Sequence, residues 1–184
     1  VYDFGKETLL RRMEQFIDDY NLEVDRFKRA KQPVDVDNFV NPARIKWDGT
    51  LKQRLKEHKF GEFDPARIRT SLYRPFTKQF LYFDRQFLNS VYRQRYFFPT
   101  PTHELENQAI GLTDLGSEKP FMVMLVNAIA DLHLVGTGCG TQCFPFYVYA
   151  EDGSERRENI TDWAAGRFRE HYGDGSITKW DIFY

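Results

Sequence analysis

The basic and aromatic side chains between positions 67 and 95 have the types and spacing best suited to binding a nucleic acid. Seven Arg or Lys residues stand there against one acidic residue, Asp84. Arginine can bind a phosphate or a guanine edge through two hydrogen bonds, and tyrosine can stack on a base or donate to a phosphate. The candidate DNA-binding residues are therefore Arg67, Arg69, Tyr73, Arg74, Lys78, Arg85, Tyr92, Arg93 and Arg95.

The same stretch also fits a structural role. Alternation along a strand would place Arg67, Arg69 and Tyr73 on one face. In the alternative interpretation, the aromatic side chains belong to a core and the charges form a solvated rim. The net charge of the chain is −1, so no global basic field indicates a nucleic-acid partner. Composition alone leaves both interpretations open.

Other residues of catalytic or metal-binding type have poor spacing. His133, Cys139 and Cys143 could supply three metal ligands, but structural zinc needs four, in tight pairs. No pattern places a base beside either thiol. The glycine-rich run at residues 136–140 lacks the Lys-Ser/Thr of a phosphate-binding loop and is interpreted as a flexible turn. The sequence therefore predicts no metal site and no catalytic residue.

Paired acid/base side chains occur but match no known enzyme signature. The candidate pairs are Asp131 with His133 and Glu104 with Glu106. Similar pairs occur by chance in most domains. The Asn/Asp-Pro-Pro-Tyr/Phe run with which amino-methyltransferases hold the target amine does not occur. This segment alone is therefore not expected to transfer a methyl group.

Composition is that of a globular chain. The 184 residues are 41% apolar, 29% charged and 16% aromatic, which suits one domain or slightly more. Two cysteines argue against a disulfide-rich secreted scaffold. No apolar run reaches the roughly 18 residues that span a membrane, so we expect a cytoplasmic protein with no membrane partner. A first residue other than Met, and a helix start at Thr178 close to the last residue, suggest a fragment truncated at its C-terminus.

Residues 6–31 are predicted to form a long helix. Its apolar positions are spaced four, three, four and three residues apart, at Met13, Ile17, Tyr20, Val24 and Phe27. Whether this seam packs on its own domain or docks on a neighbouring one is left open. Residues 32–42, with two prolines and alternating acids, are predicted to be an extended linker.

The middle of the chain indicates a short helix and several strands. A capping box at Thr50 predicts a helix that ends near Gly61 with Leu51 and Leu55 facing inward. A β-hairpin is expected from residues 68–73 and 79–83, with Pro75 in the turn and Phe76 in the core. Further strands are expected at residues 108–113, 121–126, 132–135 and 144–149.

A last helix is predicted after Thr161 and before Gly173. Its expected buried stripe consists of Trp163, Ala164, Phe168 and Tyr172. Helices, then strands, then helices, without strand–helix–strand alternation, indicate an α+β fold. We therefore expect a long N-terminal helix, a β-hairpin and a small, mostly antiparallel sheet with flanking helices.

Three runs carry a family resemblance. They are Tyr73-Arg74-Pro75-Phe76-Thr77-Lys78 leading into Leu81-Tyr82-Phe83-Asp84, Asp131-Leu132-His133-Leu134 followed by Gln142-Cys143-Phe144-Pro145, and Arg156-Arg157-Glu158-Asn159-Ile160-Thr161-Asp162-Trp163 continuing to Ser176-Ile177-Thr178-Lys179-Trp180-Asp181-Ile182-Phe183-Tyr184. In this order, after the opening Val1-Tyr2-Asp3-Phe4 and its helix, they resemble the C-terminal part of the Type ISP restriction-modification enzymes. The resemblance covers essentially the whole chain.

The resemblance implies a parent that fuses a nuclease, a helicase-like ATPase, an adenine methyltransferase and a target-recognition domain. Such a parent would bind an asymmetric DNA site, methylate adenine N6 and cleave unmodified DNA, as a site-specific methyltransferase and ATP-dependent restriction endonuclease. It would use S-adenosylmethionine, ATP and Mg²⁺, none of which is expected in this segment. Residues 1–42 would be a helical connector and linker after the methyltransferase domain, and residues 43–184 the target-recognition domain.

Two functions follow from the resemblance. In the first, this segment recognises a DNA sequence and positions double-stranded DNA for the methyltransferase and motor domains of the same chain, without being an enzyme by itself. In the alternative, it is an intramolecular scaffold that couples those two domains without reading bases. Motifs that the family shares are expected to serve scaffolding or phosphate contact, so Arg74 is expected to be a phosphate anchor at most.

Overall fold

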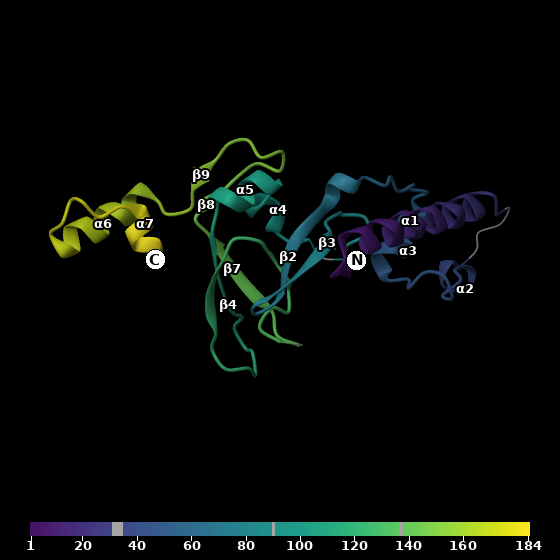
Figure 1. The fold of residues 1–184 in the computed structure, drawn as a ribbon, viewed down its shortest axis with the longest axis horizontal. Coiled ribbons are helices and arrows are strands. Elements are labelled where there is room, and N and C mark those ends of the chain that lie inside the picture. Colours follow the sequence, from purple (N-terminus) through teal and green to yellow (C-terminus); the bar gives the residue numbers. More distant parts are fainter. Residues whose placement is uncertain (31–34, 90, 137) are drawn as a thin grey trace. The chain divides into compact units, whose positions relative to one another are not determined.

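The computed structural model describes residues 1–30, 35–89, 91–136 and 138–184. These residues form an α+β fold, which confirms the predicted fold class (Figure 1). The helices are α1 (Lys6–Lys28), α2 (Val36–Phe39), α3 (Gly49–Lys56), the 3₁₀ turn η1 (Pro65–Arg67), α4 (Gln94–Phe97), α5 (Pro101–Glu106), α6 (Asp162–Tyr172) and α7 (Lys179–Phe183). The strands are β1 (Tyr2–Asp3), β2 (Ile68–Arg74), β3 (Thr77–Tyr82), β4 (Ala109–Thr113), β5 (Val123–Val126), β6 (Ile129–Ala130), β7 (Thr141–Pro145), β8 (Tyr147–Val148) and β9 (Arg157–Glu158).

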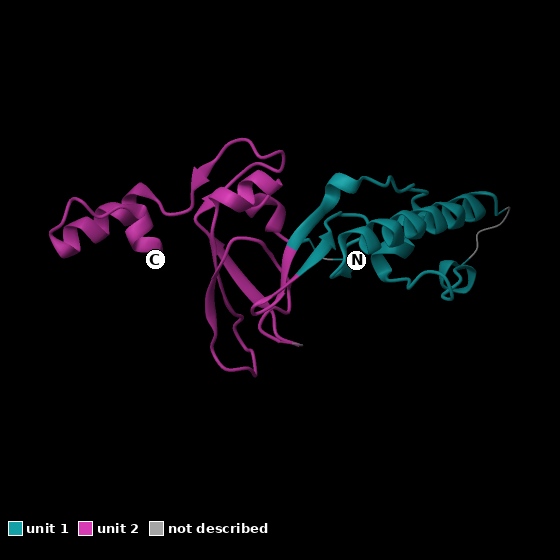
Figure 2. Ribbon diagram, viewed as in Figure 1, with its two compact units in different colours: residues 1–70, 79–91 teal, residues 71–78, 92–184 magenta. Residues whose placement is uncertain are grey.

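The chain divides into two compact units (Figure 2). Unit 1 contains residues 1–70 and 79–91, and unit 2 contains residues 71–78 and 92–184. Both boundaries in the hairpin fall inside strands β2 and β3, so each unit receives part of each strand. The expected division at residue 42 concerns the domains of a longer enzyme, and it stays a prediction. Across the described parts of both units, no helix is long and apolar enough to cross a membrane.

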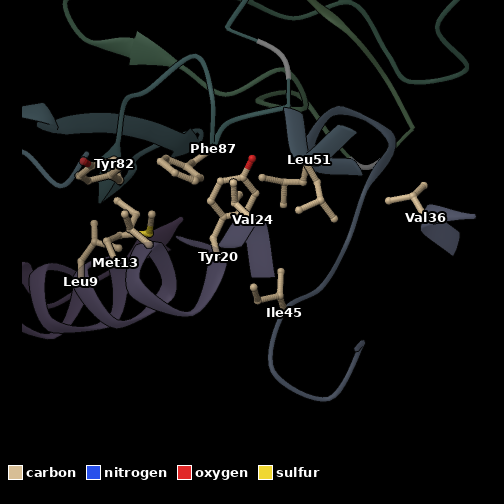
Figure 3. Packing of buried hydrophobic residues seen from close by; sticks show 11 residues of the cluster. Leu9, Met13, Tyr20, Val24, Val36, Ile45, Leu51, Tyr82 and Phe87 are labelled. Carbon is tan, nitrogen blue, oxygen red and sulfur yellow. The ribbon is translucent and has the colours of Figure 1, made fainter. Parts of the chain in front are cut away.

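Helix α1 supplies one side of the core of unit 1. Its predicted seam is confirmed, because Met13, Ile17, Tyr20 and Val24 are all buried and the fifth member, Phe27, is partly buried against the same core. Figure 3 shows Met13 and Tyr20 extending from α1 toward residues of the later chain, and the Tyr20 ring meets the Phe87 ring edge-on with centroids 5.5 Å apart. Of the two roles left open for this seam, the structure thus shows packing within its own unit. The helix ends at Lys28, three residues before the expected end.

Two short helices close the same core. Leu51 and Leu55 of α3 are buried as predicted, but the N-cap is Asp48, whose carboxylate accepts from the Leu51 N–H, and not Thr50. The helix ends at Lys56 and not near Gly61. The expected extended linker is also wrong in part, because Val36 begins helix α2 and is 1% exposed. Residues 32–34 of that expected linker lie outside the described residues.

Strands β2 and β3 form the predicted hairpin. In unit 1, β3 pairs antiparallel with β1 through Leu81 and Tyr2. In unit 2, β2 pairs in parallel with β6, with Ser71 opposite Ile129, and the Ser71 hydroxyl donates to the Ile129 carbonyl at 2.8 Å. The turn between the two strands consists of Pro75 and Phe76.

A three-stranded antiparallel sheet in the order β5-β4-β7 occupies the middle of unit 2. The expected strands near residues 108–113 and 121–126 are confirmed as β4 and β5. The expected segment 144–149 is split between β7 and β8, and β8 pairs with β9. The strand expected at residues 132–135 is wrong: these residues turn, because the Asp131 carboxylate accepts from the His133 N–H and the Leu134 N–H bonds back to the Asp131 carbonyl.

Helices α6 and α7 end the described chain. Thr161 caps α6 by accepting from the Ala164 N–H, and Gly173 ends it with a left-handed φ of 64°, both as predicted. The expected buried stripe is wrong, since the exposed fractions are 76% for Trp163, 41% for Phe168 and 66% for Tyr172. The buried residue is Ala165 instead. The capping box at the start of α7 is present, and Trp180 of α7 stacks on Phe146.

Candidate nucleic-acid interface

The nine candidate DNA-binding residues fall into both units. Arg67, Arg69 and Arg85 belong to unit 1, and unit 2 contains Tyr73, Arg74, Lys78, Tyr92, Arg93 and Arg95. The two groups are therefore described separately. Within each group, burial and ion pairing separate side chains that the structure uses internally from side chains that an external ligand can reach.

Arg67 of unit 1 is engaged by two carboxylates. Its guanidinium forms an ion pair with Asp84 and lies 3.5 Å from Asp64. Burial is the largest single influence and by itself would lower the pKa of Arg67, but the charge of Asp84, together with the smaller contributions of Tyr82, the hydrogen bond to Asp84 and Asp64, raises the pKa. Asp84 is 8% exposed and accepts in addition from the N–H groups of Gln86 and Phe87, at 2.6 and 3.1 Å. The arginine is thus part of a network that holds the end of the hairpin.

Arg69 and Arg85 differ in exposure. Arg69 is 5% exposed, and its guanidinium carbon lies 5.9 Å from the centre of the Phe83 ring. A side chain this deeply buried supports the strand and is poorly placed to reach an external phosphate. Arg85 is exposed on the loop that follows β3, where an anionic ligand can approach it.

In unit 2, Arg74 anchors the hairpin turn. Its Nη1 atom donates to the Tyr73 carbonyl at 2.6 Å and to the Asp131 carboxylate at 3.1 Å. The guanidinium carbon also lies 4.2 Å from the centre of the Tyr73 ring, within cation–π distance. In the sequence, Asp131 is a candidate acid/base partner of His133. In the structure, it is the internal counter-ion of Arg74.

Arg95 is engaged in a similar way. Its Nη2 atom donates to the Tyr96 hydroxyl at 2.9 Å, and its Nε atom lies 3.6 Å from a carboxylate oxygen of Glu151. The side chain is 20% exposed. Both Arg74 and Arg95 thus retain partial access to solvent, although each already has an anionic neighbour in its own unit.

Three side chains of unit 2 are available to an external anion or base. Lys78, Tyr92 and Arg93 are exposed. Among the described residues, no hydrogen bond or ion pair holds these three side chains. Tyr92 has a φ of 45°, which is unusual for a residue other than glycine. In unit 2, these residues are the most accessible part of the predicted basic and aromatic group, as Arg85 is in unit 1.

The expected position of Phe76 is wrong. It was assigned to the core, but it is 95% exposed in the turn of the hairpin. Strand alternation does not apply to turn residues, so periodicity could not have revealed this. The signal that could have done so is Pro75, which fixes the turn and thereby places the next side chain at its tip.

The alternative metal and thiol chemistry finds little support in the geometry. His133 Nδ1 lies 3.2 Å from the Cys139 carbonyl oxygen, and Gln94 Nε2 lies 3.6 Å from Cys143 Sγ. Burial raises the pKa of the Cys143 thiol, which lowers its nucleophilicity at neutral pH. Within the described ranges, no group of three or more His, Cys, Asp or Glu side chains is arranged to hold a metal ion.

The carboxylate pair on α5 is likewise used within unit 2. Glu106 accepts from the Tyr149 hydroxyl at 3.1 Å and from Arg156 at 3.4 Å. Burial, followed by these contacts with Glu106, raises the pKa of Tyr149. The glutamate therefore joins α5 to the chain around β8 and β9, which is a structural arrangement.

Comparison with protein families identifies one family for the whole chain. The family model described as the Type ISP C-terminal specificity domain matches residues 1–184. The chain is similar to part of a DrdV–DNA complex solved by cryo-electron microscopy, with 32% identity and a TM-score of 0.85, over 100% of this chain and 17% of that chain. No curated protein matches the sequence.

Two further solved structures are similar. A nuclease-deletion mutant of the Type ISP restriction-modification enzyme LlaGI, in complex with a DNA substrate mimic, is 28% identical with a TM-score of 0.78 over 94% of this chain and 16% of that chain. LlaBIII, an ATP-dependent Type ISP restriction-modification enzyme bound to DNA, shares the fold, at 24% identity and a TM-score of 0.79 over 100% of this chain and 12% of that chain. This chain thus spans 12–17% of the length of these neighbours. It belongs to the family of Type ISP C-terminal specificity domains.

Proposed function

We propose that this chain recognises a specific sequence in duplex DNA as part of a longer restriction-modification enzyme. The observation that carries the proposal is the match of a specificity-domain family over the full length of the chain. The similar structures, in which the corresponding segment is a small part of a DNA-bound enzyme, support it.

The accessible cations and aromatic side chains fit this function. We assign phosphate contact to Lys78 and Arg93 of unit 2 and to Arg85 of unit 1, because they are exposed. Tyr92, also exposed, can stack on a base or donate to a phosphate. Within unit 1, Arg67 and Arg69 would support the accessible surface from within. Within unit 2, Arg74 and Arg95 would do so, and the partly exposed Tyr73, Arg74 and Arg95 could add contacts.

The catalytic steps would belong to other domains of the longer enzyme. We propose that this enzyme is a site-specific DNA adenine methyltransferase and ATP-dependent restriction endonuclease that uses S-adenosylmethionine, ATP and Mg²⁺. The role of this chain would be to hold duplex DNA in the position that the methyltransferase and motor domains require. No residue of this chain is assigned to binding any of the three cofactors.

Selection from a duplex library tests the proposal. The full-length polypeptide that contains residues 1–184 is mixed with duplexes whose central segment is randomised, and the bound molecules are sequenced. We expect enrichment of one asymmetric sequence. Two results together would favour the scaffold role instead. The polypeptide would bind duplexes without enriching a sequence, and removal of the Lys78 and Arg93 charges would leave ATPase activity that no longer leads to cleavage.

The salt dependence of binding tests the residue assignments. Each lost phosphate contact should reduce the slope of log K against log salt concentration by about 0.9. We expect this reduction for Lys78→Gln and for Arg93→Gln, measured with the enriched duplex. Arg11→Gln is the matched control, because Arg11 is an exposed arginine on the acid-rich helix α1. An unchanged slope in both test variants would contradict the assignment.

A further inference from the structure

Among the described residues, Phe76 has the most exposed large apolar side chain. It is 95% exposed at the tip of the β2–β3 hairpin. Among the described residues, no aromatic ring lies in contact with it. A phenyl ring held in water forgoes the stabilisation that burial would bring. Single exposed apolar side chains are common on protein surfaces, so exposure points to a partner here only together with the strained backbone and the adjacent cation.

The backbone at Phe76 is also unfavourable for this residue type. Its φ is 64°, in the left-handed region. Pro75 fixes the preceding φ near about −65°, and this combination is that of a type II turn, whose third position favours Gly or Asn. A bulky residue at such a position is strained, and strain of this kind concentrates at functional sites. Both exposure and backbone geometry therefore disfavour phenylalanine locally.

Hydrogen bonds of strand β2 hold the tip of the hairpin in place. Arg74, directly before the turn, donates to the Tyr73 carbonyl and to the carboxylate of Asp131 on a distant segment of unit 2. Ser71 fixes the same strand to the Ile129 carbonyl. The ring is thus presented from an anchored hairpin and not from a loose loop, which lowers the entropy lost when the ring binds.

The charge around the ring indicates what the partner is. The hairpin, residues 68–82, contains no acidic residue; of its three cations, Arg69 is buried and Arg74 is paired with Asp131, so Lys78 carries the accessible charge. Lys78 is exposed two residues after Phe76. An apolar protein surface would leave this cation without a counter-charge, whereas DNA offers both a phosphate for the lysine and the faces of bases for the ring.

We propose that Phe76 enters the base stack of bound duplex DNA as a wedge, with Lys78 on an adjacent phosphate. The proposal rests on the proposed function and adds a contact to it. Apolar side chains that wedge between base steps unstack them partially and kink the duplex. Phe76 would then contribute to binding through stacking and through selection of steps that unstack readily.

Fluorescent base analogues test the wedge. The probe is the duplex enriched from the library, with 2-aminopurine placed at successive positions. Binding of the wild-type, full-length polypeptide should raise the fluorescence at one step, because 2-aminopurine brightens when it is unstacked. In Phe76→Gly this rise should disappear and the Kd should increase about 5- to 150-fold, the range that stacking on one base provides.

The variants separate stacking from folding. Glycine suits the left-handed turn, so Phe76→Gly should fold at least as stably as the wild type, and Phe76→Asn is a second variant that suits the turn. Phe76→Trp should keep the fluorescence rise. Phe121→Ser, which removes a phenyl ring that is 75% exposed elsewhere in unit 2, is the matched control and should change neither signal.

Other outcomes would overturn the wedge. If Phe76→Gly and Phe76→Asn bind the duplex as tightly as the wild type and keep the fluorescence rise, DNA recognition stands but the wedge is wrong. If Phe76→Gly instead lowers the melting temperature of the DNA-free polypeptide, the ring packs on another part of the protein and the wedge is equally wrong. If the wild type enriches no sequence, the failure lies with the proposed function.

Discussion

Asp84 should be a stability determinant of unit 1, and its replacement separates structural from DNA-binding arginines. The carboxylate receives two backbone N–H groups, from Gln86 and Phe87, and the guanidinium of Arg67. Hydrogen bonds to a charged acceptor contribute about 1.5–3 kcal/mol each, net of the bonds to water that they replace. The side chain of Arg67 is 37% exposed, so screening limits the ion pair to about 1 kcal/mol.

These contributions predict a graded series. Asp84→Ala loses all three contacts and should lower the free energy of unfolding by about 4 kcal/mol, which takes the lower estimate for each contact. Asp84→Asn keeps an oxygen for the backbone N–H groups but loses the charge, so it should lose about 1 kcal/mol for the ion pair and about 1–2 kcal/mol for the two weakened hydrogen bonds. Arg67→Gln should lose about 1 kcal/mol, the share of the ion pair. In the double variant Asp84→Asn/Arg67→Gln, the loss of stability should not equal the sum of the two single losses.

Urea denaturation followed by circular dichroism measures these differences, because α1 of unit 1 provides the longest helix. Arg67→Gln should leave the salt dependence of DNA binding unchanged at temperatures where it is folded, in contrast to Arg93→Gln. A change below about 0.5 kcal/mol in Asp84→Ala would refute the assignment of Asp84 to the structural network. A reduced salt slope in Arg67→Gln would show that Arg67 contacts phosphate.

Two further changes test the core of unit 1. Gly61→Ala should lower the free energy of unfolding by about 1–3 kcal/mol in urea denaturation, because the new Cβ would lie 2.3 Å from Phe87 Cζ. Gly49→Ala should not lower it, because nothing lies within 4 Å of the new Cβ there. Equal stability of the two variants would contradict this packing. Burial raises the pKa of Tyr20 from 10.0 to about 12. The unfolded chain therefore loses the phenol proton of Tyr20 at a lower pH than the folded chain does. Stability should be intact below pH 10 and should fall as the pH rises toward 12. A Tyr20→Phe variant that showed the same fall would assign it to another group.

Local patterns predicted the parts of the fold that local interactions decide. The seam of α1 follows from apolar spacing alone, and Thr161 and Gly173 cap α6 as expected because capping depends on adjacent residues. The buried stripe of α6 was predicted from the same kind of spacing and is wrong. Periodicity shows that a helix face is apolar, but it cannot show whether another element covers that face.

The candidate interface was predictable only as a region. The sequence pattern does not distinguish Arg67 from Arg93. In the structure, Arg67 is paired with Asp84, whereas Arg93 is exposed without such a partner among the described residues. The counter-ion of Arg74 is Asp131, 57 positions away along the chain. Such pairings are set by the tertiary fold, so the sequence could name the basic stretch but could not divide it into internal and accessible side chains.

Exchange of the whole chain tests the central claim, sequence recognition, most directly. Residues 1–184 replace the corresponding segment of LlaGI, the similar Type ISP enzyme, and the chimaera is used to select duplexes from the randomised library. We expect the chimaera to enrich the sequence that is selected by the full-length polypeptide containing residues 1–184. A folded chimaera that still enriches the sequence selected by LlaGI would contradict it.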